Sequence, residues 1–501
     1  MTDLEFWNSF PAVAEEAVKR YDFSSVAIGV IKNGKVVFSG GFGRRDCEAG
    51  LGADGETMYQ IGSCSKAFTA ALVAILVDQG KLEWDKPIRH YVPDVTLYDP
   101  FTSKECTLRD LLSHRSGLPR HEYSWYGTDF TRAQLVSNMK YFEPSQPFRT
   151  KMQYCNYGYV LAGHIVEQVT GRSWEENLQE LIFDPLGMDR TNCYIDDIEG
   201  DVNHGVPYDR PTGGDGVTGQ VKIPFYKTPC EDKSKGIGAS FAAAGSINST
   251  ADDMLKWVQM HLSSGKVGER QIISAAGVQE MHKPQMLRDN PLDMPNSETA
   301  FMSYGLGWFT ELYRGKKLVH HGGNVNGFSA FTGFIPELEL GVVAYANMNG
   351  SMLGYALARE IFDHYLGVEG GNWVQRYYDF EKENAASLPQ LIKHFTGEQV
   401  TGTAISHPLA AYAGTYRRDG YTDMVIWVEN GELQMDFIGA VNTLNHFHYD
   451  TFVTTGIVGE LPPGMPLRFL TAEVGGSIDR ISMPLVTEAG GAPIVFKKIE
   501  A

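Results

Sequence analysis

Hydrophobic residues recur with helical spacing at the start of the chain and then form strand-like runs, which predicts a mixed protein. Residues 3–20 suit an amphipathic helix. Two apolar runs, 26–31 and 36–38, flank an Asn-Gly pair at 33–34, a pattern typical of a β-hairpin. The run 67–77 is apolar almost all round, so we expect a helix buried in the core. It is shorter than the roughly 20 residues that a membrane span requires.

Helical and strand patterns continue through the first two thirds of the chain. Residues 196–238 are the exception: they are rich in Gly, Pro and Asp, so we expect a long loop region there. The other elements predict the α+β class, with an antiparallel sheet flanked by helices plus a helical region. They are helices at 107–114, 160–170, 251–262 and 352–366, a hairpin from 304–308 to 319–324, and strands at 329–335 and 341–346.

The pattern changes after Gly367 and divides the chain into three parts. We expect a first domain at 1–368, a helical linker at 369–406 and a small all-β barrel or sandwich at 407–501. Asp-Gly and Asn-Gly turn signals separate the short strands of the last part. These strands are expected near 411–417, 423–429, 432–438, 445–454, 466–473, 477–486 and 492–498.

Composition and charge narrow the range of partners. The 501 residues are 43% hydrophobic and 12% aromatic, an ordinary composition that can bury a large core. A formal net charge of -18 repels nucleic acid and anionic membranes, so we expect neither as a partner. The first residues show no basic stretch followed by an apolar segment, and the default expectation is a cytoplasmic protein. The 6 cysteines form no CxxC pair, so we expect reduced thiols, no metal and no other cofactor.

The candidate chemistry begins at the start of the buried helix, with Ser63 and Lys66. Residues three apart share a helix face, so the serine hydroxyl and the lysine amine can meet. Burial disfavours the charged form of an amine, and a neutral Lys66 can accept the serine proton. A chain of this composition contains roughly one Ser-x-x-Lys by chance. The pair alone is therefore a weak signal, and its partners have to decide between a catalytic pair and an ordinary helix start.

Two further segments offer polar groups that suit the same chemistry. Tyr154 and Asn156 are two apart, so in an extended piece both point the same way. The structural alternative is a tyrosine packed on the helix that follows. His321 precedes Gly322 and Gly323, and glycines let a ligand lie against backbone NH groups, as an oxyanion site needs. A turn at a strand end with a surface histidine is the competing interpretation.

An aromatic stretch lies between these motifs. Tyr123, Trp125 and Tyr126 stand among polar residues, and loops of that composition often form the wall of a site. They predict an apolar or aromatic acyl or leaving group in the substrate. His114, at the end of a short helix, is interpreted as structural.

The motifs, in their order and at their wide spacing, resemble those of a known family. The resemblance is to the penicillin-recognising serine hydrolases related to class C β-lactamases, which have a β-lactamase/transpeptidase-like fold, and it covers roughly residues 10–366. The final segment looks like the lipocalin-like C-terminal domain that some of these hydrolases carry. The motifs are Ser63-x-x-Lys66, Tyr154-x-Asn156 and His321-Gly322-Gly323.

The resemblance implies a mechanism. Ser63 attacks a carbonyl, Lys66 and Tyr154 share the role of base, and an acyl-enzyme forms. Which of the two is the resting base stays open, because two close titrating groups behave as a pair. Asn156 would hold the acyl side chain. The backbone NH groups of Ser63 and Asn324 would bind the oxyanion.

The third motif departs from the family pattern. β-Lactamases and DD-carboxypeptidases of this family generally carry Lys-Thr-Gly where this chain has His321-Gly322-Gly323. Histidine has an unperturbed pKa of about 6.5 and is mostly neutral at pH 7. A permanent cation for a substrate carboxylate is therefore missing, and the pattern is closer to the esterases, D-aminopeptidases and D-amino-acid amidases of the family.

We therefore expect a serine hydrolase that cleaves amide or ester bonds of small molecules or short peptides, D-amino-acid peptides included. Whether the chain assembles into a homo-oligomer is left open. An acyltransferase such as a peptide cyclase, or a β-lactamase, would use the same acyl-enzyme. A catalytically silent binding protein on this fold is the alternative from another class. The joint presence of Ser63, Lys66 and Tyr154 speaks against it.

Overall fold

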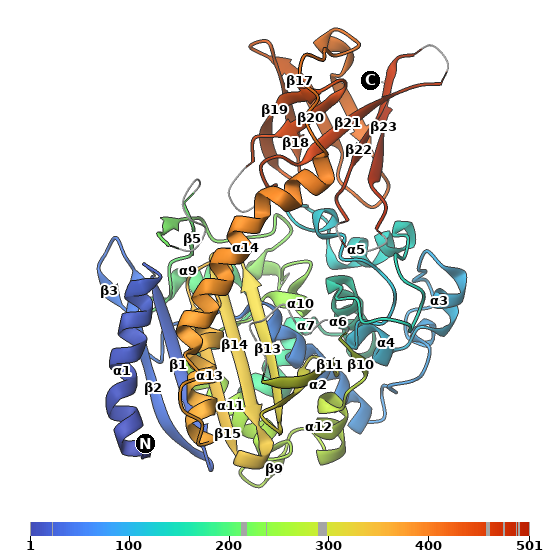
Figure 1. Ribbon diagram of the computed structural model, residues 1–501. Helices are drawn as coiled ribbons and strands as arrows, with labels where there is room; N and C mark the ends of the chain where they lie inside the picture. The colour runs from blue at the N-terminus through green and yellow to red at the C-terminus, as the bar shows by residue number, and fades with distance from the viewer. Residues whose placement is uncertain are drawn as a thin grey trace.

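The chain folds into a body of helices and a large sheet, with a β-barrel connected to it by one long helix (Figure 1). The predicted α+β class, with its flanked antiparallel sheet and terminal barrel, is confirmed. The computed structural model describes residues 2–22, 24–211, 218–236, 238–288, 298–456, 461–473, 476–486, 488 and 491–499.

An antiparallel sheet forms the centre of the body. Within the described ranges it has nine strands in the order β10-β11-β12-β13-β14-β15-β1-β2-β3. The predicted hairpin is present between β1 and β2, and the turn residues Asn33 and Gly34 have φ values of 51° and 72°. The strands are β1 (Ser25–Lys32), β2 (Lys35–Asp46), β3 (Leu51–Gly52), β10 (Met286–Leu287), β11 (Thr299–Tyr304), β12 (Phe309–Tyr313), β13 (Lys316–Val325), β14 (Phe328–Ile335) and β15 (Leu340–Ala346).

Alternate residues of the central strands pack against two different layers of helices. In β15, Val342 and Ala344 join a hydrophobic cluster with α1 (Asp3–Arg20) and α13 (Leu353–Tyr365). Val343, between them, joins the other cluster with α2 (Ser65–Asp78) and α11 (Ala251–Leu262). This period-two alternation places one helical layer on each face of the sheet.

The helical region surrounds α2, which is the predicted core helix. Its residues from Ser65 to Leu76 are all buried, as expected from their nearly uniform apolar character. The remaining helices of the body are mostly short. They are α3 (Pro100–Glu105), α4 (Leu108–Leu112), α5 (Arg132–Asn138), α6 (Asn156–Thr170), α7 (Trp174–Leu178), α8 (Asp184–Leu186), α9 (Ile195–Gly200), α10 (Ala242–Gly245) and α12 (Ala275–His282).

The region 196–238 contains more regular structure than its composition indicates. It includes α9, a 3-10 turn at Lys233–Lys235, and a two-stranded ribbon of β5 (Tyr208–Asp209) and β6 (Val221–Lys222). Residues 212–217 and 237 lie outside the described residues. Two further two-stranded ribbons pair β4 (Tyr59–Gln60) with β7 (Asn248–Ser249), and β8 (Lys266–Val267) with β9 (Arg270–Gln271).

The C-terminal strands close into a barrel. Among the described residues there are eight strands, one more than the seven predicted. The single strand expected at 445–454 is wrong: Tyr449, with φ of 45°, turns the chain there without the glycine that normally signals such a turn. The strands are β16 (Gly414–Arg417), β17 (Met424–Glu429), β18 (Glu432–Phe437), β19 (Ala440–His448), β20 (Thr451–Thr454), β21 (Pro466–Thr471), β22 (Ile478–Met483) and β23 (Ile494–Ile499).

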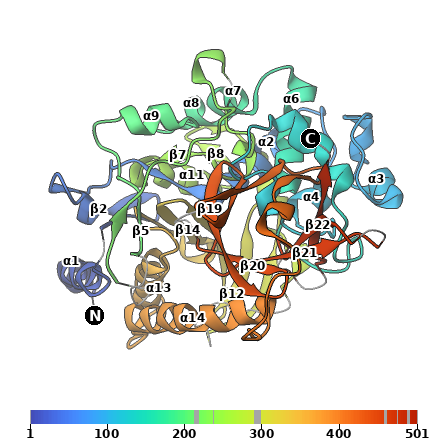
Figure 2. The same ribbon diagram turned by 90° about the horizontal axis from the view of Figure 1, so that it is seen from above.

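The connecting helix α14 (Trp373–Thr396) runs along the body and ends beside the barrel (Figures 1 and 2). It coincides with the predicted helical connector, while the domain limits at 368 and 406 stay predictions. In the part of the chain that the structure describes, none of the helices combines the length and the apolar character needed to cross a membrane.

Candidate active site

Ser63 lies in a tight 3-10 turn, Gly62–Cys64, directly before α2. Lys66 follows on the first turn of that helix, and its Nζ donates to Ser63 Oγ at 2.9 Å. The same Nζ donates to the carbonyl of Ala244 in α10 at 2.7 Å. The structure thus joins the two residues of the first motif and orients the amine with a second contact.

The surroundings of Lys66 disfavour its charged form. Its side chain is fully buried, and this burial lowers its pKa well below the usual 10.5, with the nearby Arg120 cation contributing in the same direction. A neutral amine at this place can take the Ser63 proton while it still donates to the Ala244 carbonyl. Burial therefore prepares Lys66 for the role of base.

Tyr154 is held over the same amine by the segment before α6. His114 accepts hydrogen bonds from both neighbours of Tyr154: its carbonyl from Gln153 N at 2.7 Å, and its Nδ1 from Cys155 N at 3.1 Å. The ring centre of Tyr154 lies 4.9 Å from Lys66 Nζ. Through these two hydrogen bonds, the buried His114 fixes the segment that carries Tyr154.

The Tyr154 phenol is protonated in the resting site. Burial raises its pKa above the usual 10, although a hydrogen bond with Ser63 acts in the opposite direction. At neutral pH, Lys66 is therefore the more readily available base, and the phenol is a proton donor beside the serine oxygen.

The strand β13 brings backbone NH groups to the nucleophile. A Cβ added at Gly323 would overlap the carbonyl of Ile61 and lie 3.1 Å from Ser63 N, so only glycine permits this approach. A Cβ at Gly62 would lie 2.8 Å from Asn324 N. The NH groups of Ser63 and Asn324 are thereby brought close together, which is the arrangement that an oxyanion site requires.

The His321 side chain forms its hydrogen bonds with groups other than Ser63 and Lys66. Its Nδ1 donates to the Gly322 carbonyl at 2.6 Å, so its Nε2 accepts from the hydroxyl of Tyr304 at 2.9 Å. Burial lowers its pKa to about 3. The histidine is therefore neutral at pH 7, as its ordinary pKa indicated. The neighbouring Gly322 is required for a steric reason, because a Cβ there would collide with the Tyr355 hydroxyl.

A pocket of about 140 Å³ opens beside Ser63 and Asn156. Trp125 and Tyr126 line it, as the aromatic stretch predicted, whereas Tyr123 is not among its lining residues. Tyr123 is partly buried and packs against the core next to the pocket.

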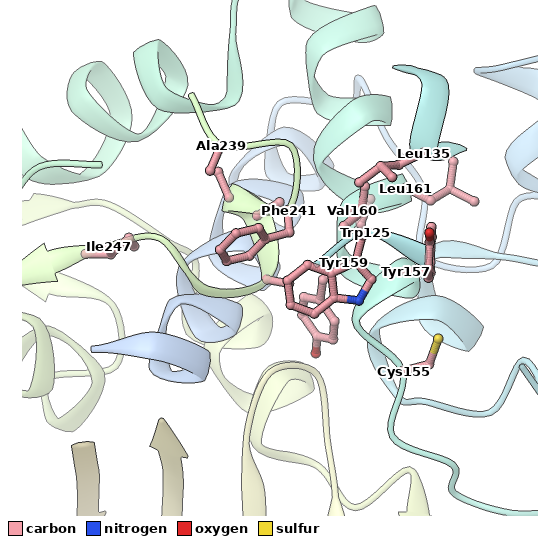
Figure 3. Packing of buried hydrophobic residues seen from close by; sticks show 14 of the residues in the cluster. Trp125, Leu135, Cys155, Tyr157, Tyr159, Val160, Leu161, Ala239, Phe241 and Ile247 are labelled. Atoms are coloured by element: carbon pink, nitrogen blue, oxygen red, sulfur yellow. The ribbon is translucent and has the colours of Figure 1, made fainter. Parts of the chain in front are cut away.

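Two aromatic residues that the sequence did not single out complete the wall. Phe241 packs against Trp125 (Figure 3), and their ring centres lie 4.8 Å apart. Tyr226 stacks on Tyr126 with centres 4.4 Å apart and nearly parallel planes. The pocket thus has an aromatic wall of four rings.

Charged residues also line the pocket, and they correct one expectation. Arg120 places a permanent cation at the site, so the missing lysine of the third motif does not leave the pocket without one. Its Nε donates to Glu122 at 2.5 Å, and its guanidinium carbon lies 5.2 Å from the ring centre of Tyr154. Asn156 Nδ2 donates to Glu122 at 3.2 Å, and no partner for its buried Oδ1 is found among the described residues.

The residues that sequence reasoning missed lie in irregular segments. Arg120 and Glu122 flank His121, whose φ of 47° marks a tight turn without glycine. Tyr226 belongs to the region 196–238, whose composition carried no periodic signal. The family motifs do not include these positions, so only the folded chain reveals them.

Comparison with known proteins agrees with this geometry. Residues 10–366 match the family Beta-lactamase, and residues 398–498 match a domain of unknown function, DUF3471. A hydrolase of unguisins from Aspergillus violaceofuscus is 28% identical over 491 residues, which cover 92% of this chain and 85% of that protein.

Two solved structures share the fold. The octameric penicillin-binding protein homologue from Pyrococcus abyssi has a TM-score of 0.61 and 23% identity, covering 99% of this chain and 100% of that one. The D-amino acid amidase from Ochrobactrum anthropi, in complex with D-phenylalanine, has a TM-score of 0.56 and 22% identity, covering 75% of this chain and 99% of that one. Since the family match spans well over half of the 501 residues and its fold is the one described above, the chain belongs to the β-lactamase family.

Proposed function

We propose that this protein is a serine hydrolase that forms an acyl-enzyme on Ser63 and cleaves amide or ester bonds of small molecules or short peptides. The observation that carries the proposal is the buried amine of Lys66, 2.9 Å from Ser63 Oγ at the base of a pocket. Membership of a family of hydrolases and similarity to a protein named as a hydrolase support it.

In the proposed reaction, each residue of the site has its own role. Neutral Lys66 takes the Ser63 proton as the oxygen attacks the substrate carbonyl, and an oxyanion forms between the backbone NH groups of Ser63 and Asn324. The Tyr154 phenol then protonates the leaving group, and water releases the acyl group by the reverse proton movements. The loss of one oxyanion donor typically costs about 3–4 kcal/mol of transition-state stabilisation.

The pocket supports an acyl group with an apolar or aromatic side chain. The stacked rings of Tyr126 and Tyr226 and the paired rings of Trp125 and Phe241 offer large apolar surfaces. Glu122 also lines the pocket and offers a carboxylate that can accept from a substrate ammonium group. These groups together favour amides or esters of aromatic amino acids with a free amine.

The test compares an anilide of D-phenylalanine that has a free amine with its N-acetylated form, with Ser63→Ala as the control. We expect faster turnover of the free amine and none in the variant. Equal rates for both anilides would remove the role of Glu122. Turnover that persists in Ser63→Ala would contradict the proposal as a whole.

Arg120 favours a second candidate substrate class, compounds with a carboxylate, β-lactams included. A guanidinium can pair with a carboxylate through two NH groups, although here it shares its charge with Glu122. Hydrolysis of a chromogenic cephalosporin that is lost in Arg120→Gln would support this class. Addition of an amine nucleophile to either assay, followed by product analysis, separates hydrolysis from acyl transfer.

The chain's assembly is a separate proposal. The Pyrococcus relative is described as octameric, and we propose that this chain also self-associates, which light scattering after size-exclusion chromatography would measure. The cytoplasmic location stays a prediction from the sequence.

A further inference from the structure

A second cavity, of about 220 Å³, lies between the body and the barrel. Its lining residues include His121 and Tyr141 from the body, and Arg418, Tyr421 and Ile494 from the barrel. It shares no lining residue with the pocket beside Ser63. The two sites are nevertheless adjacent, because His121 stands between two residues that line the catalytic pocket.

His121 contributes a nearly buried side chain to the wall of this cavity. Only 4% of the residue is exposed, and its ring stacks on Phe142 with centres 4.4 Å apart. Its Nδ1 lies 2.6 Å from the Tyr421 hydroxyl, which can donate its proton there. Burial, together with the charge of Arg418, lowers the pKa of His121 to about 4, so the ring is neutral at pH 7 and carries its proton on Nε2. Within the described part of the chain, Nε2 has no partner.

Arg418 supplies a second donor of the same kind. Its Nε is buried and also lacks a partner among the described residues. The guanidinium is permanently charged, and a buried donor that lacks an acceptor destabilises the fold because it has lost its hydrogen bonds to water. Glu143 is the acidic residue on the cavity wall, and it is exposed to solvent, unlike His121. His121 and Arg418 both line this cavity, and each carries a buried N–H donor for which no partner is found among the described residues.

We propose that this cavity between the body and the barrel binds a small monocarboxylate with a compact apolar or aromatic body. The carboxylate oxygens accept from His121 Nε2 and from the Arg418 guanidinium. The apolar part lies against Tyr141, Val486 and Ile494. An apolar cavity of about 150 Å³ is enough for benzene, so this larger one has room for a ring and its carboxylate.

Two sources offer this chemistry. One is the carboxylic acid released by the reaction proposed above, and the other is a carboxylate unrelated to it. The binding site itself does not depend on the proposed reaction, because it rests on the two unpartnered donors and the cavity alone.

The test is calorimetric titration of the full chain with benzoate, with its neutral counterpart benzamide and with inorganic phosphate. We expect benzoate to bind about tenfold or more tightly than either of the others, since a charge-assisted hydrogen bond is worth about 1.5–3 kcal/mol. Arg418→Gln should weaken benzoate binding by a similar factor. Two matched variants should leave it within about twofold: Arg417→Gln, which removes a neighbouring exposed guanidinium paired with Asp423, and Arg120→Gln, which removes the cation of the catalytic pocket.

Several results would overturn the proposal. Equal binding of benzoate and benzamide would exclude charge recognition, and this comparison needs no variant that must fold. Phosphate that binds as tightly as benzoate would exclude the role of the apolar wall. Loss of binding in Arg120→Gln but not in Arg418→Gln would place the ligand in the catalytic pocket.

A final arm separates the two sources. The acid released from the most rapidly cleaved ester is titrated into Ser63→Ala and compared with benzoate. Tighter binding of that acid identifies the reaction product as the ligand, and weaker binding identifies an independent carboxylate. If no ester is cleaved at all, the proposed function fails while the benzoate titration still decides the fate of the site.

Discussion

Replacement of Gly323 by alanine tests the geometry around the nucleophile most sharply. Gly323 lies on β13 with a backbone conformation that alanine accepts, so the effect of the substitution is purely steric. The new Cβ would lie 2.8 Å from the carbonyl carbon of Ile61 and overlap its oxygen, where ordinary contact begins at 3.4 Å. The turn that holds Ser63 therefore has to move by at least about 0.6 Å relative to the strand that holds Asn324.

A displacement of this size acts directly on catalysis. Misplacement of reacting groups by about 1 Å costs on the order of 10²-fold in rate, and loss of one oxyanion donor costs about 10²–10³-fold. We expect kcat/KM of Gly323→Ala to fall by about 10²-fold, mostly through kcat, because the oxyanion contact is stronger in the transition state than in the ground state. Overpacking of the core should lower the free energy of unfolding by about 1–3 kcal/mol.

The assay measures steady-state hydrolysis of an activated ester, with urea unfolding followed by circular dichroism to confirm that the variant is folded. Gly200→Ala is the matched control, since a Cβ there meets no atom within 4 Å. A folded Gly323→Ala protein with at least half of the wild-type kcat would refute the assignment of this strand to the oxyanion site.

Three further predictions concern titration and stability. When kcat/KM is measured against pH, the acid limb of the profile should have its midpoint well below 10.5, because protonated Lys66 cannot accept a proton. A midpoint near 10.5 in a stopped-flow pH series would argue against Lys66 as the base. Arg359→Met should lower the free energy of urea unfolding by about 3–5 kcal/mol, since it leaves the fully buried carboxylate of Glu311 without its ion-pair partner. Arg417→Gln, which breaks an exposed ion pair, should lower it by less than about 1 kcal/mol. Equal losses in the two variants would contradict the burial argument. Burial raises the pKa of Glu231 from 4.5 to about 7, so its contribution to stability is present below pH 4.5 and is lost as the pH rises through 7. In thermal unfolding, the free energy of unfolding of Glu231→Gln should therefore exceed that of wild type by about 3 kcal/mol at pH 8 and match it at pH 4. The reverse order would refute this linkage.

The sequence predicts the main elements of the fold well where periodicity is strong. The buried helix α2, the hairpin of β1 and β2, and the connector α14 all lie close to their expected positions. Each of them has a clear apolar pattern or an Asn-Gly turn. The barrel strand count was wrong because Tyr449 adopts a positive φ without a glycine, and no local signal reveals such a turn.

In the candidate site, too, the sequence reveals the residues that have a regular spacing and not those that lie in irregular turns. Ser63 and Lys66 were recognisable because spacing on one helix fixes their proximity, and the structure places Lys66 Nζ 2.9 Å from Ser63 Oγ. The pairing of Arg120 with Glu122 was not, because both lie in a turn whose shape depends on contacts with the rest of the chain. The barrel takes part in those contacts, since Tyr421 approaches His121 at 2.6 Å.

The central claim is that Ser63 is a nucleophile activated by Lys66, and covalent trapping tests it most directly. The full chain is treated with a fluorophosphonate and analysed by intact mass spectrometry and peptide mapping. We predict one adduct on Ser63, none in Ser63→Ala, retention in Ser65→Ala, and labelling in Lys66→Met slowed by about 10²-fold or more. An adduct on another residue, or wild-type labelling of Ser63→Ala, would contradict the account.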